Sequence, residues 1–185
     1  MTKSEQTRDN ILSVSLELFS EKGFDGTGMR DVAKKAGVSL GLTYNYFNSK
    51  EALLTEIILD HSRKIKDWFI SKYQETDSPD KAKDMLIENY LEILQGNEEY
   101  FRLFWSLMLQ PKILKDQEAL ITGMFEMIYE SFTKIPSKQK SGFTDIDRKH
   151  MMILILGSTI NYLVKKDLFP IDTLREILKA KAGDL

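Results

Sequence analysis

The chain has 185 residues, of which 42% are hydrophobic and 29% are charged, as in folded globular proteins. It contains no cysteine, which excludes disulfide bonds and thiolate metal sites, and its two histidines, His61 and His150, are far apart in sequence. The N-terminus lacks the apolar core of a signal peptide, and no run reaches the roughly 20 apolar residues of a spanning helix. We therefore expect a cytoplasmic protein with no metal and no cofactor.

The formal net charge is −2, which on its own argues against a nucleic-acid partner. The distribution of charge weakens that objection, because residues 1–50 carry seven Lys or Arg and six Asp or Glu. This basic excess is too small to identify a binding surface. A case for nucleic-acid binding must therefore depend on particular residues in particular positions.

Apolar residues recur at helical spacing along nearly the whole chain, and no convincing run alternates with a period of two, so the sequence predicts an all-α protein of nine helices. The first helix is predicted over 4–22, ending at Gly23. Thr27 is predicted to cap a second helix that Gly37 ends. Ser39 is predicted to cap a third, very short helix.

A long fourth helix is predicted to begin after Asn48, whose side chain would cap it in a capping box with Glu51. Ser78 and Pro79 suit the N-cap and first residue of a fifth helix ending near residue 95. The remaining helices are predicted over residues 97–110, 112–134, 145–166 and 171–182.

Two short helices that meet at a glycine turn and pack on a longer first helix form a helix-turn-helix. In that motif the second helix enters the major groove of DNA and its first residues meet base edges. The segment 39–50, SLGLTYNYFNSK, suits this role, because Gly41 would permit a close approach to DNA. Short polar and methyl groups suited to base edges are carried by Ser39, Leu40, Leu42, Thr43 and Asn45.

Phosphate contacts are predicted around these base-reading positions. Tyr44 and Lys50 are assigned to phosphate oxygens, and Tyr46 either to phosphate or to packing. Arg30 is expected to bind DNA rather than to pair only with a nearby acid. Thr27 is predicted to add a phosphate contact to its capping role, as is Ser39.

The N-terminal segment resembles the tetracycline-repressor (TetR) family of bacterial transcription regulators over about residues 8–54. The matching residues are Arg8, Ile11, Leu12, Leu18, Phe19, Gly23, Phe24, Thr27, Met29, Arg30, Val32, Ala33, Ala36, Gly37, Val38, Ser39, Gly41, Tyr44, Tyr46, Phe47, Ser49, Lys50, Glu51 and Leu53. Members of this family often have a small polar residue followed by an apolar one at these two positions, and Leu42-Thr43 has the reverse order. The resemblance implies that Leu42 meets bases and that Thr43 turns inward.

The resemblance also implies a DNA-binding domain over residues 1–47 and an effector-binding and dimerisation domain over 48–185. It implies a homodimer that binds a palindromic DNA operator, most often as a repressor, and a small effector that releases it. The candidate effector-pocket residues are His61, Ile65, Trp68, Tyr90, Phe101, Phe104, Trp105, Met108 and Met124. The candidate dimer-interface residues are Ile153, Leu156, Gly157 and Ile160.

The aromatic and Met content of the candidate pocket suggests a mostly apolar effector. Two other functions are compatible with the same sequence. An activator, or a helical adaptor that binds protein, would use the same N-terminal module. An enzyme on a helical bundle is not expected, because the chain offers no Ser/His/Asp set, metal cluster or phosphate-binding glycine loop.

Overall fold

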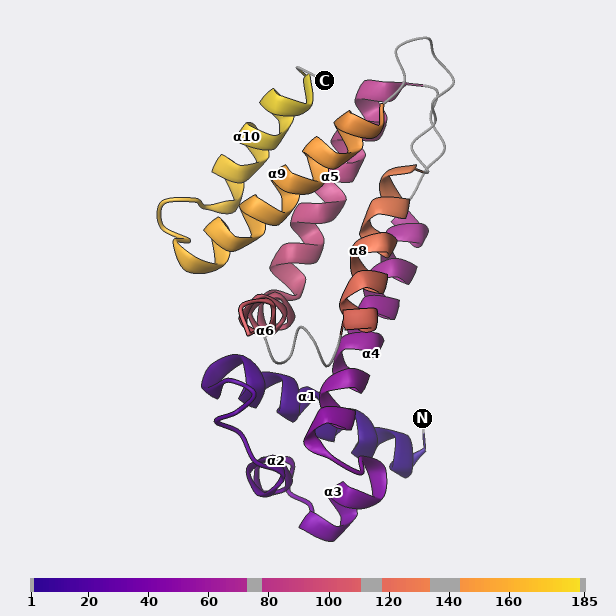
Figure 1. Cartoon of the computed structure of the whole chain (residues 1–185), viewed down its shortest axis with the longest axis vertical. Coiled ribbons are helices and arrows are strands. Elements are labelled where there is room, and N and C mark those ends of the chain that lie inside the picture. Colours follow the sequence, from indigo (N-terminus) through magenta and orange to yellow (C-terminus); the bar gives the residue numbers. More distant parts are fainter. Residues whose placement is uncertain (1, 73–77, 111–117, 134–143, 184–185) are drawn as a thin grey trace. The chain divides into compact units, whose positions relative to one another are not determined.

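The computed structural model describes residues 2–72, 78–110, 118–133 and 144–183, and every regular element within these ranges is an α-helix (Figure 1). The prediction of an all-α protein is therefore confirmed. The nine helices of the described ranges are α1 (Lys3–Lys22), α2 (Met29–Ala36), α3 (Leu40–Tyr46), α4 (Lys50–Lys72), α5 (Pro79–Gly96), α6 (Glu98–Met108), α8 (Glu118–Thr133), α9 (Asp145–Val164) and α10 (Ile171–Gly183).

The helices divide into two compact units, and α4 contributes to both. The head unit comprises Met1–Lys64 and Glu99–Gln117, which include α1, α2, α3 and nearly all of α6. The body unit comprises Ile65–Glu98 and Glu118–Leu185, which include α5, α8, α9 and α10. A functional boundary after residue 47 stays a prediction, since these units are defined by packing and not by function.

The core of the head unit lies on the inner face of α1. Ile11 and Phe19 are fully buried there, and Val32 of α2 and Leu53 of α4 are equally inaccessible to solvent. Phe19 packs edge-to-face on Phe24 of the loop after α1, with 5.2 Å between ring centroids. Burial of such side chains is the main favourable term in folding. It is what holds the short helices α2 and α3 in place.

Side-chain hydrogen bonds and ion pairs connect α1 to both short helices. The Asn10 side-chain amide donates to the Ala36 carbonyl at the end of α2, at 2.9 Å. The Ser4 hydroxyl hydrogen bonds the Tyr46 hydroxyl at the end of α3, at 3.0 Å. Glu17 of α1 forms an ion pair with Lys35 of α2. These contacts help to fix the orientation of α2 and α3 on α1, because each one joins residues that are distant in sequence.

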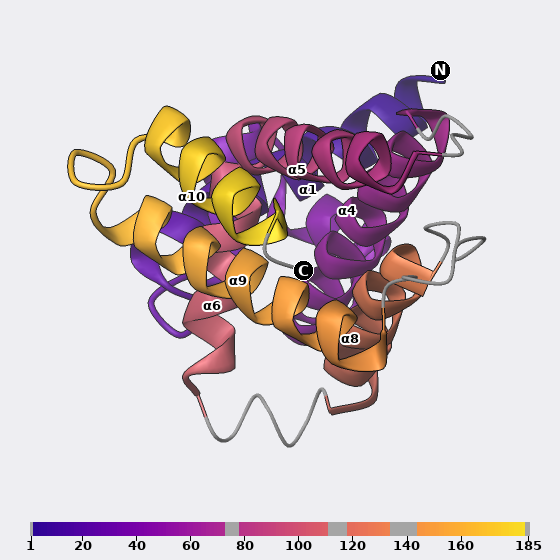
Figure 2. The ribbon, with the colours of Figure 1, turned by 90° about the horizontal axis from the view of Figure 1, so that it is seen from above.

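In the body unit, α10 packs against both α5 and α9, and α9 packs against α8 (Figures 1 and 2). Tyr90 of α5 is buried and its hydroxyl donates to the Ile155 carbonyl of α9 at 3.1 Å. Burial raises the pKa of the Tyr90 hydroxyl to about 12. Glu88 of α5 accepts hydrogen bonds from Arg175 and Lys179 of α10. The unit thus combines an apolar core with polar ties between its helices.

Most predicted helix ends agree with the structure to within a few residues. Gly23 ends α1 with φ +77°, and Ser78 with Pro79 begins α5. The cap of α4 was predicted wrongly: Ser49, not Asn48, accepts the hydrogen bond from the Ala52 amide. The predicted helix over 112–134 corresponds to α8, and residues 112–117 lie outside the described ranges.

Candidate nucleic-acid interface

The turn between α2 and α3 has the backbone geometry of a helix-turn-helix. Gly37 lies in the left-handed region with φ +69° and ψ 29°, which glycine adopts without a steric penalty. Its amide donates to the Lys34 carbonyl, and the next amide, that of Val38, donates to the Ala33 carbonyl at 3.0 Å. These bonds satisfy the last carbonyls of α2 and redirect the chain into α3.

The third helix is held by its cap and by its buried face rather than by its intrinsic propensity. Ser39 accepts a hydrogen bond from the Leu42 amide at 3.1 Å, as the sequence predicts. Thr43 is 0% exposed and its hydroxyl donates to the Ser39 carbonyl. The buried Phe47 ring follows the helix, and the Arg8 guanidinium lies over it. Thr43 therefore turns inward, as the resemblance implies, and its side chain is not placed to contact a base.

Four of the remaining residues of α3 are exposed. Leu42 is 36% exposed and Tyr44 is 45% exposed, and both Gly41 and Asn45 are exposed. Ser39 before the helix is exposed as well, while Leu40 and Tyr46 are half-buried. The structure thus places most of the predicted base-reading residues on one accessible helix surface.

Thr27 does not occupy the position predicted for it. Gly28, not Thr27, is the N-cap residue of α2, and the Asp31 carboxylate accepts from the Gly28 amide at 2.9 Å. Thr27 is 1% exposed, and its hydroxyl donates a shared hydrogen bond to the carbonyls of Leu18 and Gly23. The capping prediction is therefore wrong, and the buried side chain is not placed to contact a phosphate. Thr27 fixes the loop to the end of α1.

Replacing Thr27 with valine, which has nearly the same shape, tests this structural role. Thr27→Val removes a buried donor and is expected to lower the free energy of unfolding by about 1–3 kcal/mol. Denaturant unfolding measures the change. Thr7→Val is the matched control, since the Thr7 hydroxyl makes a hydrogen bond to the Lys3 carbonyl at the surface, and it should change stability by no more than about 0.5 kcal/mol. Unchanged stability of Thr27→Val with weakened DNA binding would contradict the role.

Lys50, predicted to bind phosphate, makes its contacts inside the head unit in this structure. Its ammonium donates to the Phe24 carbonyl at 2.8 Å and lies 4.2 Å from the centroid of the Phe24 ring. Both contacts tie the start of α4 to the loop after α1. Lys50 is half-buried, so a phosphate contact by its ammonium stays a prediction and would compete with the Phe24 carbonyl.

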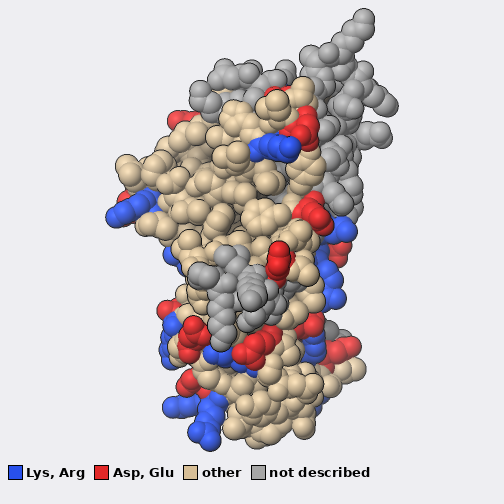
Figure 3. All heavy atoms as spheres, viewed as in Figure 1, with Lys and Arg blue, Asp and Glu red and all other residues tan. Residues whose placement is uncertain are grey.

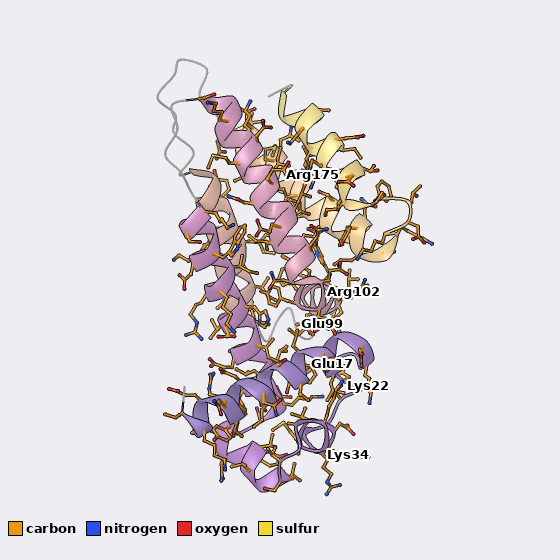
Figure 4. All side chains as sticks on the ribbon, turned by 180° about the vertical axis from the view of Figure 1, so that it is seen from behind. Glu17, Lys22, Lys34, Glu99, Arg102 and Arg175 are labelled. Atoms are coloured by element: carbon orange, nitrogen blue, oxygen red, sulfur yellow. The ribbon has the colours of Figure 1, made fainter. Side chains whose placement is uncertain are left out.

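Exposed cations lie beside α3 on helix α2. Arg30 and Lys34 are four residues apart and therefore share one face of α2, and both are exposed. Figure 4 shows Lys34 on the side of α2 away from α1, whereas the neighbouring Lys35 pairs with Glu17 of α1. In Figure 3 blue side chains gather beside the uncharged surface of α3. Lys34 was not predicted as a site residue, although its spacing from Arg30 could have indicated it.

The head unit also contains an aromatic cluster, in which the candidate effector-pocket residues His61 and Phe104 stack on Tyr100, a residue that was not predicted for the pocket. The His61 ring stacks on Tyr100 with 4.9 Å between centroids, and Tyr100 in turn stacks on Phe104. Burial is the largest cause that lowers the pKa of His61, and burial raises the pKa of Tyr100 to about 12. The indole N–H of Trp105 is buried and has no hydrogen-bond partner among the described residues. Phe101 and Met108 are half-buried in the same unit.

The other candidate pocket residues belong to the body unit. Ile65 and Trp68 are half-buried on α4, and Tyr90 is hydrogen bonded to α9 as described above. Met124 lies in α8, but its side chain is outside the described part of the structure. Assembly of these residues into one effector pocket stays a prediction.

The candidate dimer residues lie on α9, and two of them are strongly exposed. Ile153 is 66% exposed and Ile160 is 41% exposed, while Leu156 and Gly157 are half-buried. Ile153 and Ile160 are seven residues apart and therefore share a helix face. Ile146 and Val164, also exposed, continue the same stripe toward the two ends of α9.

In the described ranges no three His, Cys, Asp or Glu side chains are grouped so that they could hold a metal ion. No helix in the same ranges has the length and hydropathy needed to cross a membrane.

An outward-facing third helix after a left-handed glycine turn is the arrangement of a helix-turn-helix, a motif that places its second helix in the major groove of DNA. A family model described as bacterial regulatory proteins, tetR family, matches residues 11–57. The chain is 34% identical over 157 residues to the HTH-type transcriptional regulator RutR of Escherichia coli K12, covering 82% of this chain and 71% of RutR. The chain belongs to the TetR family of transcriptional regulators, whose members are not enzymes.

Two further relatives agree with this assignment. The HTH-type transcriptional regulator UidR of Escherichia coli K12 is 40% identical over 63 residues, covering 34% of this chain and 32% of UidR. A transcriptional regulator from Aquifex aeolicus VF5 of known structure is 26% identical, with a TM-score of 0.75 over 96% of this chain and 98% of that chain. The similarity to solved structures therefore extends well beyond the DNA-binding helices.

Proposed function

We propose that this regulator is a homodimeric repressor that binds a palindromic operator and is released by a small, mostly apolar effector. The proposed operator binding is supported mainly by the exposed surface of α3, which lies beside the exposed cations of α2. Arg30 and Lys34 would bind phosphates, and Leu42 and Asn45 would face the bases. The recognition helices of such dimers meet half-sites about one helical turn apart, roughly 34 Å, or a multiple of it.

The exposed apolar stripe of α9 supports the homodimer. A soluble protein rarely leaves a group of large apolar side chains on one helix face in water unless a partner covers it. Ile153 and Ile160 lie at the middle of the stripe, and Gly157 between them leaves open space where a Cβ would stand. Two copies of this helix can therefore pack closely, and α10 offers the exposed Ile177 beside α9.

The aromatic cluster of the head unit supports the effector. The buried rings of Tyr100 and Phe104, with His61 beside them, form an apolar environment. The Trp105 N–H, which has no hydrogen-bond partner among the described residues, could donate to an acceptor on a ligand. An effector that binds one arrangement of the heads more tightly shifts the population away from the DNA-bound state. Because α4 contributes to both units, its tilt is the proposed connection between effector and DNA. Equal separation of the two Tyr44 side chains across the dimer, with and without effector, would contradict this mechanism.

The salt dependence of DNA binding tests the proposed phosphate contacts. Duplexes that bind the protein are first selected from a random-sequence library, and their affinity is measured at several salt concentrations. The logarithm of the binding constant should fall by about 0.9 per neutralised phosphate for each tenfold rise in salt. Arg30→Ala or Lys34→Ala should reduce this slope by about 0.9 per bound protomer, and hence by about 1.8 in a symmetric dimer.

Lys35→Ala is the matched control. It removes a lysine adjacent to Lys34, but the Lys35 ammonium pairs with Glu17 in the free protein. Its slope should stay close to that of the unaltered chain. Equal slopes for all three variants would contradict a role of α2 in phosphate binding, and failure to bind any duplex at low salt would contradict the proposed function as a whole.

A further inference from the structure

The outward surface of α3 carries no charged side chain. The helix sequence, LGLTYNY, contains no acid and no base, and its exposed residues are Gly41, Leu42, Tyr44 and Asn45. Figure 3 shows the same property as an uncharged surface over α3. The surface that enters the groove therefore offers apolar groups, a phenol and an amide.

This chemistry favours one class of base pair over the other. Guanine presents two acceptors in the major groove and is most often bound by Arg or Lys, and α3 has neither. Thymine presents a C5-methyl group that apolar side chains contact, and adenine presents an acceptor and a donor that match the Asn amide. The nearest cation along the chain, Lys50, already donates to the Phe24 carbonyl.

Gly41 supports a close approach of the helix to the duplex. Glycine inside a helix is destabilising relative to alanine, so its presence calls for a reason. A Cβ added at Gly41 would meet nothing within 4 Å inside this chain. No packing of the described protein requires glycine at this position, and a surface outside the chain explains it. Gly41 and Asn45 are four residues apart and share a face of α3, so the same approach would bring the Asn45 amide to the base edges.

We infer that α3 reads A·T pairs, and that Leu42 packs on the C5-methyl group of a thymine in each half-site. The inference rests on the proposed operator binding and adds the chemistry of the bases read. Thr43 is excluded as the reader because its side chain is fully buried. Asn45 is the second reader, with its amide on an adenine.

Replacement of thymine by uracil tests the inference, because uracil lacks only the methyl group. A duplex selected from a random library is resynthesised with uracil at one thymine position at a time, symmetrically in both half-sites. At one position, the loss of each methyl group should lower the affinity by about fourfold. The duplex that is substituted in both half-sites should therefore bind about fifteenfold more weakly. In Leu42→Ala the same replacement should have little effect, since the apolar partner is missing.

Each outcome of this experiment tests a different part of the proposal. If no uracil replacement changes affinity, or if Leu42→Ala keeps the full loss, then Leu42 does not contact a thymine methyl group. If the selected half-sites have G·C pairs at every position whose preference changes in Leu42→Ala and Asn45→Ala, the A·T inference is wrong. If no duplex is selected at low salt, the operator proposal itself fails. Circular dichroism of the variants, which alter exposed residues, checks that they are folded.

Discussion

The double variant Ile153→Glu, Ile160→Glu is expected to be monomeric and to lose about 100-fold or more of its affinity for a two-half-site operator. Two charges placed on the exposed stripe of α9 would have to be buried, unpaired, if the helices of two protomers still paired. The affinity loss follows because a linked pair of binding heads gains about 10²–10⁴-fold over a single head. Sedimentation measures the oligomeric state, and binding to a labelled duplex measures the affinity.

Two controls separate dimer loss from unfolding. Leu109→Glu also places a glutamate at an exposed apolar residue, in the turn directly after α6 and outside the proposed interface, and should leave both dimer and affinity unchanged. The double variant should also bind a duplex with a single half-site as weakly as the unaltered chain does. A double variant that stays dimeric would show that α9 is not the dimer interface.

Phe19→Ala is expected to destabilise the head unit by about 3–5 kcal/mol and to abolish measurable DNA binding. Phe19 is fully buried and packs on Phe24, and the Lys50 ammonium lies over the Phe24 ring. The lost free energy is a large share of the about 5–15 kcal/mol typical of whole proteins. The seven-residue α3 cannot remain helical without this core, because isolated helices below about 12–15 residues are marginal in water.

The conservative variant Phe19→Leu provides the comparison. It keeps most of the apolar volume, and the expected cost is below about 1.5 kcal/mol, with DNA binding retained. Denaturant unfolding and duplex binding are measured for both variants. If Phe19→Ala bound DNA with unaltered affinity, the recognition helix would not depend on the core of the head unit.

Signals carried by one or two neighbouring residues predicted the fold well. Gly23 and Gly37 ended the first two helices because both adopt positive φ, which other residues rarely do. Ser39 and Ser78 were correctly predicted as caps, since each side chain accepts from an amide three residues ahead. Helical periodicity located all nine helices of the described ranges.

The predictions that failed concern choices between neighbouring residues. Thr27 was predicted as the cap of α2, but its hydroxyl bonds to the end of α1 and the next residue, Gly28, is the N-cap. In the same way, Asn48 was predicted as the cap of α4, and the next residue, Ser49, accepts the hydrogen bond from the helix. No role was predicted for either lysine of α2, and their different surroundings, with Lys35 paired to Glu17, appear only in the structure. Such outcomes depend on distances between segments that the local sequence does not specify.

By itself, the sequence determined an all-α chain, the helix-turn-helix over its first 50 residues and the surface chemistry of α3. These follow from the helical periodicity of apolar residues, from the glycines at the turns and from the residue types along α3. Only the tertiary structure decided which of those side chains are available to DNA. It buried Thr27 and Thr43, tied Lys50 to Phe24, and left Leu42, Tyr44 and Arg30 exposed. The physical reason is that exposure is set by packing between helices distant in sequence, which fixes the face that each helix turns to solvent.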